Sequence, residues 1–357
     1  MMKPILPTLQ TRLLLVRRYP HMYRRLVAPR IDFSGRRAEF YRGYWLHAAE
    51  AIDAEVEILE DNYLEISRAG RSTIVQFHFV DLDTYFAKAL MDDKRFVSNL
   101  VREMGFASPR FSEFKLTDRE PAFRFMEEVG LPCVVKPRVG SGGSGVTTGI
   151  THRKRLIRAA LAASIARSLP TLMIEEQIAG DSYRLLYLDG ELLHAVRRGA
   201  STIVGDGTSS IKQCVVAENT RRLECSGVES ISELTLDLDL EYTLADQGLT
   251  SRSVPRKGEI VKVKNVSNQN SARDQENVTD RVHRDYHRIA RGVLDRLGAR
   301  LVGVDVMAED ISHAPVESGS AINEINIPPG LHYHEFIEGQ ERRSRAGSVI
   351  LNRLLGG

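Results

Sequence analysis

Residues 301–330 read LVGVDVMAED ISHAPVESGS AINEINIPPG and hold two apolar segments around a polar loop. We expect both segments to be strands (Leu301–Met307 and Ala321–Ile327), the second ended by Pro-Pro-Gly. Side chains alternate between the faces of a strand, so Glu324 and Asn326 share one face. Asp305 stands among valines, where an ionised carboxylate is costly unless something pairs with it.

Asp305, Glu324 and Asn326 together offer only oxygen ligands. Such ligands suit Mg²⁺, which takes one or two carboxylates and completes its shell with phosphates and water. The alternative is that the carboxylates form buried salt bridges. Two strands supply the set and a tight turn follows at once, so we favour a metal site.

A second stretch, residues 133–150, reads CVVKPRVGSG GSGVTTGI. A strand over Cys133–Lys136 leads into a glycine-rich turn, and a further strand follows over Val146–Ile150. Glycines let backbone N–H groups approach phosphate oxygens, and Lys136 supplies a cation. No helix follows the loop, and no Asp or Glu occurs from 129 to 174, which argues against a dinucleotide-binding fingerprint. Leu172–Ile178 then offers backbone groups for an adenine edge and acids for a ribose.

Periodicity and turn residues predict the remaining elements. Residues 36–60 read as a helix and then a strand, and Asp189-Gly190 as the turn of a hairpin. Asp280 is expected to cap a helix that Gly298 closes. Further elements are expected as a strand over Thr73–Val80, helices over 92–105 and 153–169, and a strand over Leu172–Glu176.

Composition narrows the class of protein. The 357 residues carry 49 Lys and Arg against 47 Asp and Glu, a net charge of +2, so no basic field for nucleic acid exists. The first 30 residues hold seven Lys or Arg and no acid, which we read as a solvated surface segment. No segment has the ~20 apolar residues of a membrane span. Three cysteines without a CxxC pair argue against disulfides and zinc, and favour a reducing cytoplasm.

Several motifs in collinear order resemble the ATP-grasp superfamily of carboxylate–amine ligases. They include DDKRFVSNLVREMGFASP, VVKPRVGSGGSGV, IEEQIAGDSYRLLYLDGELLHAVRR, VGDGTSSI, GVDV and INEINIPPG. The likeness spans residues 90–335. It is nearest to the ATP-grasp module of cyanophycin synthetase, and more distant to D-alanine–D-alanine ligases and to glutathione-synthesis and ribosomal-S6-modifying ligases.

The resemblance implies a mixed α+β and α/β architecture, the ATP-grasp fold. It implies an N-terminal α/β (pre-ATP-grasp) domain over 1–110 and a small lid domain over 111–180. A C-terminal α+β domain over 181–357 is expected to carry the Mg²⁺ and substrate site. It also implies ATP and Mg²⁺ as cofactors.

The resemblance further assigns roles to individual residues. Arg198, Arg184 and Lys136 are implied as catalytic, and Asp305, Glu324 and Asn326 as the Mg²⁺ ligands. The implied nucleotide-binding set is Lys94, Lys136, Ser141, Gly142, Gly143, Ser144, Glu175, Glu176, Gln177, Ile178, Asp181, Lys264 and Asn268.

Three places depart from the family patterns. Ala272-Arg273 replaces the small Gly-Gly pair that is expected after Asn268. Lys264 stands where cyanophycin-type sequences carry an arginine, and Gly303 where D-alanine ligases place an arginine two residues before the metal aspartate. His332 and His334, just after the Pro-Pro-Gly turn, are expected either to contact substrate or the amine proton, or merely to line the rim.

The implied activity is ATP-dependent amide formation through an acyl phosphate, with amino acids or small peptides as substrates. Neither nucleic acid nor a membrane is expected as a partner, and dimerisation is common in such families. Two alternatives stay open: a ligase for carrier-bound or protein-terminal substrates, and a nucleotide-binding regulator without catalysis.

Overall fold

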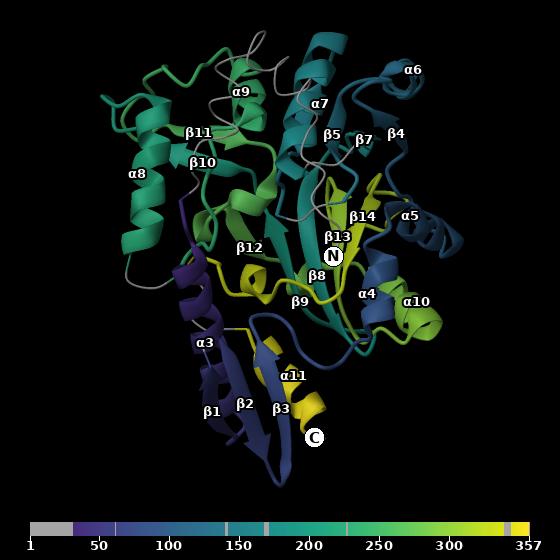
Figure 1. The fold of residues 1–357 in the computed structure, drawn as a ribbon, viewed down its shortest axis with the longest axis vertical. Coiled ribbons are helices and arrows are strands. Elements are labelled where there is room, and N and C mark those ends of the chain that lie inside the picture. The colour runs from purple at the N-terminus through teal and green to yellow at the C-terminus, as the bar shows by residue number, and fades with distance from the viewer. Residues whose placement is uncertain are drawn as a thin grey trace.

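The computed structural model describes residues 31–60, 62–139, 142–167, 171–225, 228–338 and 344–356. In these residues the chain forms three β-sheets of three, four and five strands and a two-stranded ribbon, each packed with helices (Figure 1). The architecture is mixed α and β, as predicted.

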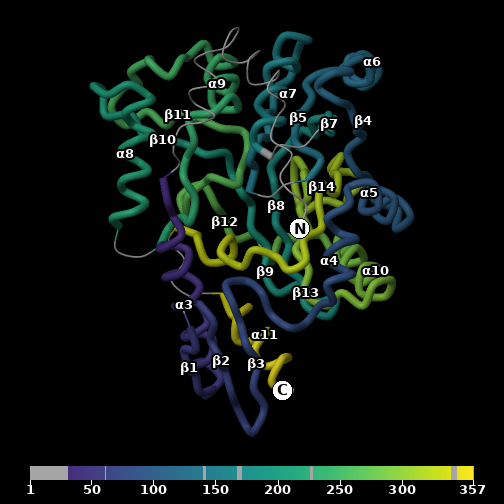
Figure 2. The backbone as a smooth tube through the Cα atoms, in the orientation of Figure 1, coloured from purple at the N-terminus to yellow at the C-terminus, as the bar shows by residue number. Residues whose placement is uncertain are grey.

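The first described elements pack with the last helix of the chain. Helix α3 (Ser34–Glu50) precedes an antiparallel sheet of β1 (Glu55–Glu60), β2 (Tyr63–Arg68) and β3 (Arg71–Gln76). Helix α11 (Ala346–Leu354) lies beside α3, although some 300 residues separate them (Figure 2). Tyr41, Trp45, Leu64, Ile66 and Ile350 are buried in the core that they share. The predicted helix and strand within 36–60 are confirmed, and the strand expected over Thr73–Val80 ends earlier, at Gln76.

The four-stranded sheet carries the glycine-rich loop. Its order is β4 (Phe111–Lys115), β7 (Thr171–Glu176), β5 (Cys133–Pro137) and β6 (Thr147–Ile150). Helices α6 (Glu120–Val129) and α7 (Arg153–Arg167) bury apolar side chains against this sheet. The loop that joins β5 to β6 therefore starts and ends on adjacent strands, the strand–loop–strand arrangement that the sequence predicts.

One face of the five-stranded sheet is apolar, and the other carries both apolar and polar side chains, since Leu186, Leu188 and Leu301 pack there into the core of α3 and α11. Its order is β12 (Gln275–Asn277), β9 (Glu191–Arg198), β8 (Asp181–Leu188), β13 (Leu301–Ala308) and β14 (Ala321–Asn326). Alternate residues, among them Leu185, Val304 and Ile325, form a core with helices α4 (Tyr85–Met91), α5 (Lys94–Glu103) and α10 (His287–Leu297). The intervening residues point to the opposite face, where the polar side chains of these strands lie.

The helix predicted from Asp280 begins later than expected. Asp280 lies in a short 3-10 turn, Thr279–Arg281, and Val282 is extended, so the helical run is interrupted. The backbone N–H of His283 donates to the Ile311 carbonyl, which fixes the chain outside a helix. Helix α10 starts only at His287, and it ends as predicted at Gly298, whose φ of 66° suits glycine.

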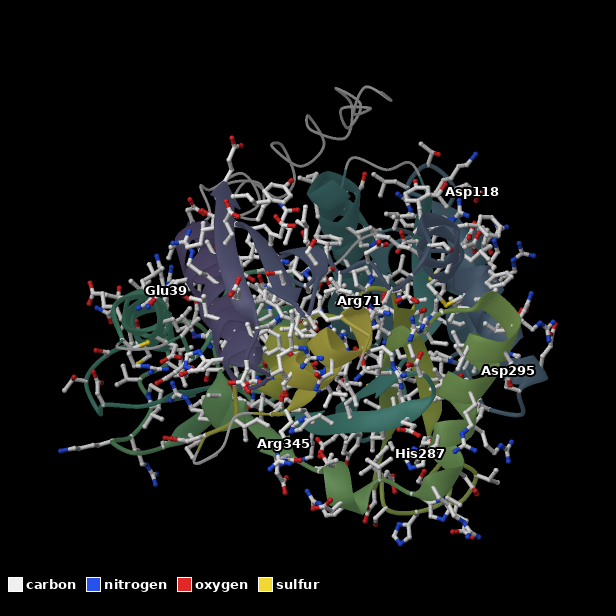
Figure 3. All side chains as sticks on the ribbon, turned by 90° about the horizontal axis from the view of Figure 1, so that it is seen from below. Glu39, Arg71, Asp118, His287, Asp295 and Arg345 are labelled. Atoms are coloured by element: carbon white, nitrogen blue, oxygen red, sulfur yellow. The ribbon has the colours of Figure 1, made fainter. Side chains whose placement is uncertain are left out.

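A smaller unit is formed by residues 201–264. Strands β10 (Ser201–Val204) and β11 (Ile260–Lys264) pair antiparallel and pack with α8 (Ile211–Glu224) and α9 (Leu238–Ala245). Charged side chains stand on several sides of the molecule in Figure 3, where the exposed Glu39, Asp118 and Asp295 are labelled. None of the helices described has the length and apolar character needed to cross a bilayer.

Candidate active site

Strand register gathers the two predicted catalytic arginines and the predicted metal-binding carboxylates on one face of the five-stranded sheet, opposite its core with α4, α5 and α10. Asp305 of β13 lies opposite Arg184 of β8 on one side and Glu324 of β14 on the other. Arg198 of β9 lies opposite Ser182 of β8, one alternate position from Arg184. The pairing puts Asp305 and Glu324 on the same face of the sheet, which the sequence alone did not predict.

Two arginines hold Asp305. Arg184 donates to both carboxylate oxygens through Nε and Nη2, with Nη2 at 2.9 Å from Oδ2. Arg198 Nη2 donates to Oδ2 at 3.0 Å and to the Ser182 hydroxyl at 2.7 Å. Burial works to raise the pKa of Asp305, but the two guanidinium groups outweigh it and hold that pKa below its usual range. Asp305 is therefore an ionised, buried carboxylate.

Tyr333 stacks on both arginines. It lies in a 3-10 turn, η5 (Leu331–His334), directly after the Pro-Pro-Gly sequence. Each guanidinium carbon, of Arg184 and of Arg198, is 5.1 Å from the centre of the Tyr333 ring. Cations at this distance are attracted to an aromatic face. Tyr333 was not singled out from the sequence, because only the fold shows that the turn lies over the sheet.

Gly303 gives the Arg184 side chain its room. A Cβ atom at Gly303 would lie 2.7 Å from Pro329 Cβ and 3.2 Å from Arg184 Cδ.

A second cluster joins the two predicted lysines. Glu175 of β7 accepts an ion pair from Lys94 Nζ at 3.2 Å and from Lys136 Nζ at 2.6 Å. Lys94 also donates to the carbonyl of Asn323. Asn323 is the extra residue of a bulge in β14, where the register with β13 shifts after Asp305, so its carbonyl is available.

These charges perturb one another. Burial lowers the pKa of Lys94 in spite of Glu175. Burial opposes the charge of Lys136 too, but Glu175 and Glu324 outweigh it and raise the pKa of Lys136. Burial would raise the pKa of Glu175, but Lys136 and Lys94 lower it below its usual range. Glu175 and Lys136 thus hold each other in their charged forms, and Glu175 lies between two basic side chains.

The glycine-rich loop reaches from the lysine cluster toward Arg198. Gly142 and Gly143 have φ of 66° and 69°, a region that favours glycine. A Cβ at Gly143 would lie 2.8 Å from Val266 Cγ1 and 3.4 Å from Asn268 Nδ2. Asn268 in turn accepts a hydrogen bond from Arg198 Nη1 at 3.3 Å. Ser144 lies in the described part of this turn, whereas Ser141 lies outside the described residues.

The residues predicted to bind Mg²⁺ offer a suitable but incomplete set. Partial loss of hydration and the facing Asp305 carboxylate raise the pKa of Glu324, although solvent reaches its side chain. Asn326 Nδ2 has no hydrogen-bond partner. Two facing carboxylates and an amide oxygen fit a hard divalent cation, which would relieve their repulsion. The arginines already occupy Asp305, and no three His, Cys, Asp or Glu side chains in the described ranges are arranged around a metal position.

Comparisons with known proteins agree with this geometry. Residues 93–183 match the family described as "Carbamoyl-phosphate synthase L chain, ATP binding domain". The glutathione biosynthesis bifunctional protein GshAB of Clostridium perfringens is 26% identical over 299 residues, which are 82% of this chain and 38% of that protein. Cyanophycin synthetase of Geminocystis herdmanii is 26% identical over 243 residues, 68% of this chain and 28% of that protein.

A bifunctional glutathione synthetase from Pasteurella multocida has a similar fold. Its crystal structure matches with a TM-score of 0.53 and 22% identity, over 87% of this chain and 44% of that chain. Together these similarities support the ATP-grasp fold and the ATP-grasp ligase superfamily for this chain. It spans less than half the length of the curated relatives it matches.

The structure does not bring every residue of the ATP-grasp pattern to one place. Lys264 is 1% exposed, and its Nζ is surrounded by Asp237 at 2.5 Å, Thr235 at 3.0 Å and Gln269 at 3.1 Å. An ammonium enclosed by three acceptors is a structural ion pair in this state of the protein. No local pattern predicts this pairing, because Asp237 and Lys264 are 27 residues apart and meet only through the fold.

The predicted adenine hinge continues from the lysine cluster. Glu176 pairs with Arg110 at 3.2 Å, and Gln177 Oε1 accepts from the Gly149 N–H at 2.8 Å. Ile178 follows in the loop before β8, and Asp181, the predicted ribose contact, pairs with Arg197 at 3.1 Å. The side chains of Glu176 and Gln177 therefore connect the hinge to the neighbouring residues Arg110 and Gly149.

The two histidines after the turn face the protein interior. His332 Nδ1 lies 3.0 Å from the Tyr41 hydroxyl, and His334 Nδ1 lies 3.1 Å from His194 Nδ1. Burial lowers the pKa of both well below the usual histidine value, so both are neutral. His334 is 1% exposed. The expectation that His334 contacts substrate or lines an open rim is wrong, because the turn directs its ring against β9.

Proposed function

We propose that this chain is an ATP-dependent ligase that joins a carboxylate to an amine. The observation that carries the proposal is the position of Glu324 between two basic clusters. Its pKa responds to Lys136 and Lys94 on one side and to Arg184 on the other, as well as to Asp305. Three cations and the Asp305 carboxylate thus act on the solvent-reachable Glu324, an arrangement that suits the transfer of a phosphoryl group to an anion.

The proposed reaction has two steps. A substrate carboxylate oxygen attacks the γ-phosphorus of ATP, the bond to the β–γ bridging oxygen breaks, and ADP leaves with an acyl phosphate formed. An amine nitrogen then attacks the acyl carbon, inorganic phosphate leaves, and the nitrogen loses a proton to solvent. The products are an amide, ADP and phosphate.

The residues of the site divide between these steps. Lys94 and Lys136 bind the phosphates. When ATP binds, its triphosphate replaces the Glu175 carboxylate as the anion between the two lysines. Backbone N–H groups of residues 142–145 cover the phosphates and exclude water, which protects the acyl phosphate from hydrolysis. Arg198 and Arg184 neutralise charge on the transferred phosphoryl group and on the tetrahedral oxyanion. Mg²⁺ held by Asp305, Glu324 and Asn326 would neutralise phosphate charge and act as a Lewis acid.

The proposal includes the domain limits predicted above, 1–110, 111–180 and 181–357, with the nucleotide between the second and third. One packing feature bears on the first limit. Helices α4 and α5 lie within 1–110 but pack against the five-stranded sheet. Lys94, the first residue of α5, is therefore positioned by a helix that packs on that sheet. The substrates proposed are a free amino acid or a small peptide.

The test is ADP release with ATP, Mg²⁺ and pooled amino acids, followed by division of the pool. We expect turnover that requires an amino acid and that falls by ~10²-fold or more in Glu324→Gln, since one charge-stabilising group of an active site is lost. Glu127→Gln, an exposed surface acid paired with Arg153, is the matched control and keeps wild-type turnover. ATP binding without turnover on any pool favours a carrier-bound substrate or a regulator, and absence of ATP binding refutes the proposal.

A further inference from the structure

One irregular segment, residues 268–274, wraps around the strand end that carries Arg198. Asn268 Oδ1 accepts from Arg198 Nη1 at 3.3 Å. Asn270 Nδ2 donates to the Gly199 carbonyl at 3.2 Å, and the Gly199 N–H donates to the Asp274 carbonyl at 2.7 Å. The approach is so close that a Cβ at Gly199 would lie 2.6 Å from the Asp274 oxygen. The placement of Arg198 therefore depends on where this segment lies.

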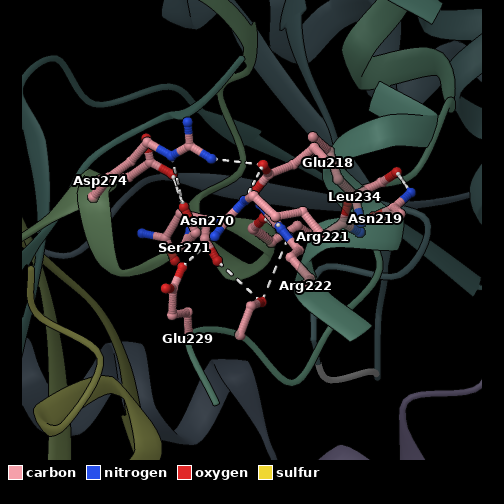
Figure 4. Close-up of polar contacts among 12 residues, drawn as sticks. Glu218, Asn219, Arg221, Arg222, Glu229, Leu234, Asn270, Ser271 and Asp274 are labelled. Atoms are coloured by element: carbon pink, nitrogen blue, oxygen red, sulfur yellow. Dashed lines mark hydrogen bonds and ion pairs between the residues drawn. The ribbon is translucent and has the colours of Figure 1, made fainter. Parts of the chain in front are cut away.

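Helix α8 holds the other side of the segment. Arg222 is 0% exposed, and its Nη1 donates to the carbonyls of Gln269 at 2.9 Å and Ser232 at 3.1 Å. Its Nε donates to Glu218 Oε1 at 2.9 Å, one turn earlier on α8. The second oxygen of Glu218 accepts from Arg273 Nη2 at 2.6 Å. Figure 4 shows Glu218 and Arg222 directed at the segment that carries Asn270, Ser271 and Asp274.

Asp274 makes hydrogen bonds both within the segment and to strand β10. Asp274 accepts from the N–H of Ser271 at 2.9 Å and from the Thr202 hydroxyl at 2.6 Å. The segment has no apolar core of its own, since Gln269, Asn270 and Ser271 are its buried side chains. Buried ion pairs of this kind add little net stability, but they define one geometry because a misplaced charge is costly. Glu218 is such a charge, because Arg221 and Arg222 outweigh its burial and lower its pKa to about 2.

We propose that Glu218, Arg222 and Arg273 are positioning residues that set Arg198 for phosphoryl transfer through the segment 268–274. The inference rests on the proposed ligase function, in which Arg198 contacts the reacting group. The three residues themselves stay out of contact with ATP in this account. The same segment touches the glycine loop through Asn268 and Gly143, so it also relates the position of Arg198 to that loop.

The test removes one tie at a time. Arg273→Met cuts the bond to Glu218 but leaves Arg221 and Arg222 to neutralise that carboxylate, so folding is retained. A catalytic group displaced by about 1 Å costs roughly 10²-fold in rate. We expect kcat to fall by ~10- to 100-fold while the Kd of a non-hydrolysable ATP analogue stays within about twofold. Arg273→Lys keeps the cation and recovers most of the rate.

The matched control is Arg221→Gln. Arg221 contacts the same Glu218 carboxylate and Glu229, but it makes no hydrogen bond to residues 268–274. Loss of this half-exposed partner leaves kcat near that of the wild type. Equal losses in Arg221→Gln and Arg273→Met would contradict the proposal, because general weakening of α8 would then explain both. A change confined to the affinity for ATP would also contradict it.

A second measurement does not depend on turnover. Hydrogen exchange of the Gly199 amide, which donates to Asp274, is expected to speed up in Arg273→Met and not in Arg221→Gln. If the wild type shows no ligase turnover, the proposed function fails, and this exchange rate still decides whether α8 holds the segment. Unchanged exchange in Arg273→Met overturns the positioning role.

Discussion

Replacing Glu175 with glutamine is expected to destabilise the nucleotide-free protein strongly. Glu175 lies between Lys136 at 2.6 Å and Lys94 at 3.2 Å, with side-chain exposures of 5%, 22% and 10%. Removing one partner of a buried pair costs about 3–5 kcal/mol, because the charge left behind is uncompensated. We take the lower end, about 3 kcal/mol, since Lys136 is partly hydrated and Glu324 also attracts both lysines. At ~2–4 °C per kcal/mol, Tm falls by roughly 6–12 °C.

The assay is thermal and denaturant unfolding with and without a non-hydrolysable ATP analogue. The triphosphate restores the missing negative charge, so the analogue stabilises Glu175→Gln more than it stabilises the wild type. Glu127→Gln, which breaks only an exposed pair with Arg153, changes stability by less than about 1 kcal/mol.

The pH dependence gives an independent check. The pKa of Glu175 is lowered in the folded state, so its contribution is fully present above its ordinary pKa near 4.5 and is lost as pH falls through the folded value. The stability difference between wild type and Glu175→Gln therefore shrinks in acid. Equal stability of the two proteins at neutral pH, or a smaller effect of the analogue on the variant, would refute the reasoning.

Three further results are expected. Tyr333→Leu lowers kcat by ~10-fold, since each cation–π contact is worth about 0.5–2 kcal/mol, while Tyr333→Phe keeps most of the rate; equal rates for both variants would show that the ring does not orient the arginines. Gly143→Ala weakens ATP binding in titration calorimetry, because its φ of 69° and a contact of 2.8 Å to Val266 resist a side chain; wild-type affinity would contradict this. Burial lowers the pKa of His194 to about 4 and that of His334 well below its usual value. At pH values below about 6.5 the unfolded state takes up protons that the folded state does not, so the free energy of unfolding decreases by up to ~1.4 kcal/mol per pH unit for each histidine. An unchanged pH slope in the His194→Leu/His334→Leu double variant would argue against this.

Local patterns were enough to predict the strands and the face they share. Alternation along 321–327 predicts that Glu324 and Asn326 share a face, and the structure adds that Asp305 lies opposite Glu324 in the register of β13 with β14. The glycine loop between two strands was predicted from its flanking apolar residues, and positive φ at Gly142 and Gly143 explains why glycine stands there.

Contacts between distant residues were beyond these patterns. The salt bridges of Asp305 come from Arg184 and Arg198, 121 and 107 positions away. The sequence left open whether Asp305 is a metal ligand or forms a buried salt bridge, and the structure shows the salt bridges. The start of α10 was misplaced because the backbone of His283 bonds to Ile311 across the fold. Lys264 was assigned to ATP by resemblance, but Asp237 and Gln269 enclose it.

The most direct test of the ligase mechanism follows an oxygen atom. A substrate amino acid found in the ADP-release assay is labelled with ¹⁸O in its carboxylate and turned over once with ATP and Mg²⁺. An acyl phosphate intermediate transfers one labelled oxygen to inorganic phosphate, and the nucleotide product is ADP. Label recovered in AMP, or phosphate released without label, would contradict the account.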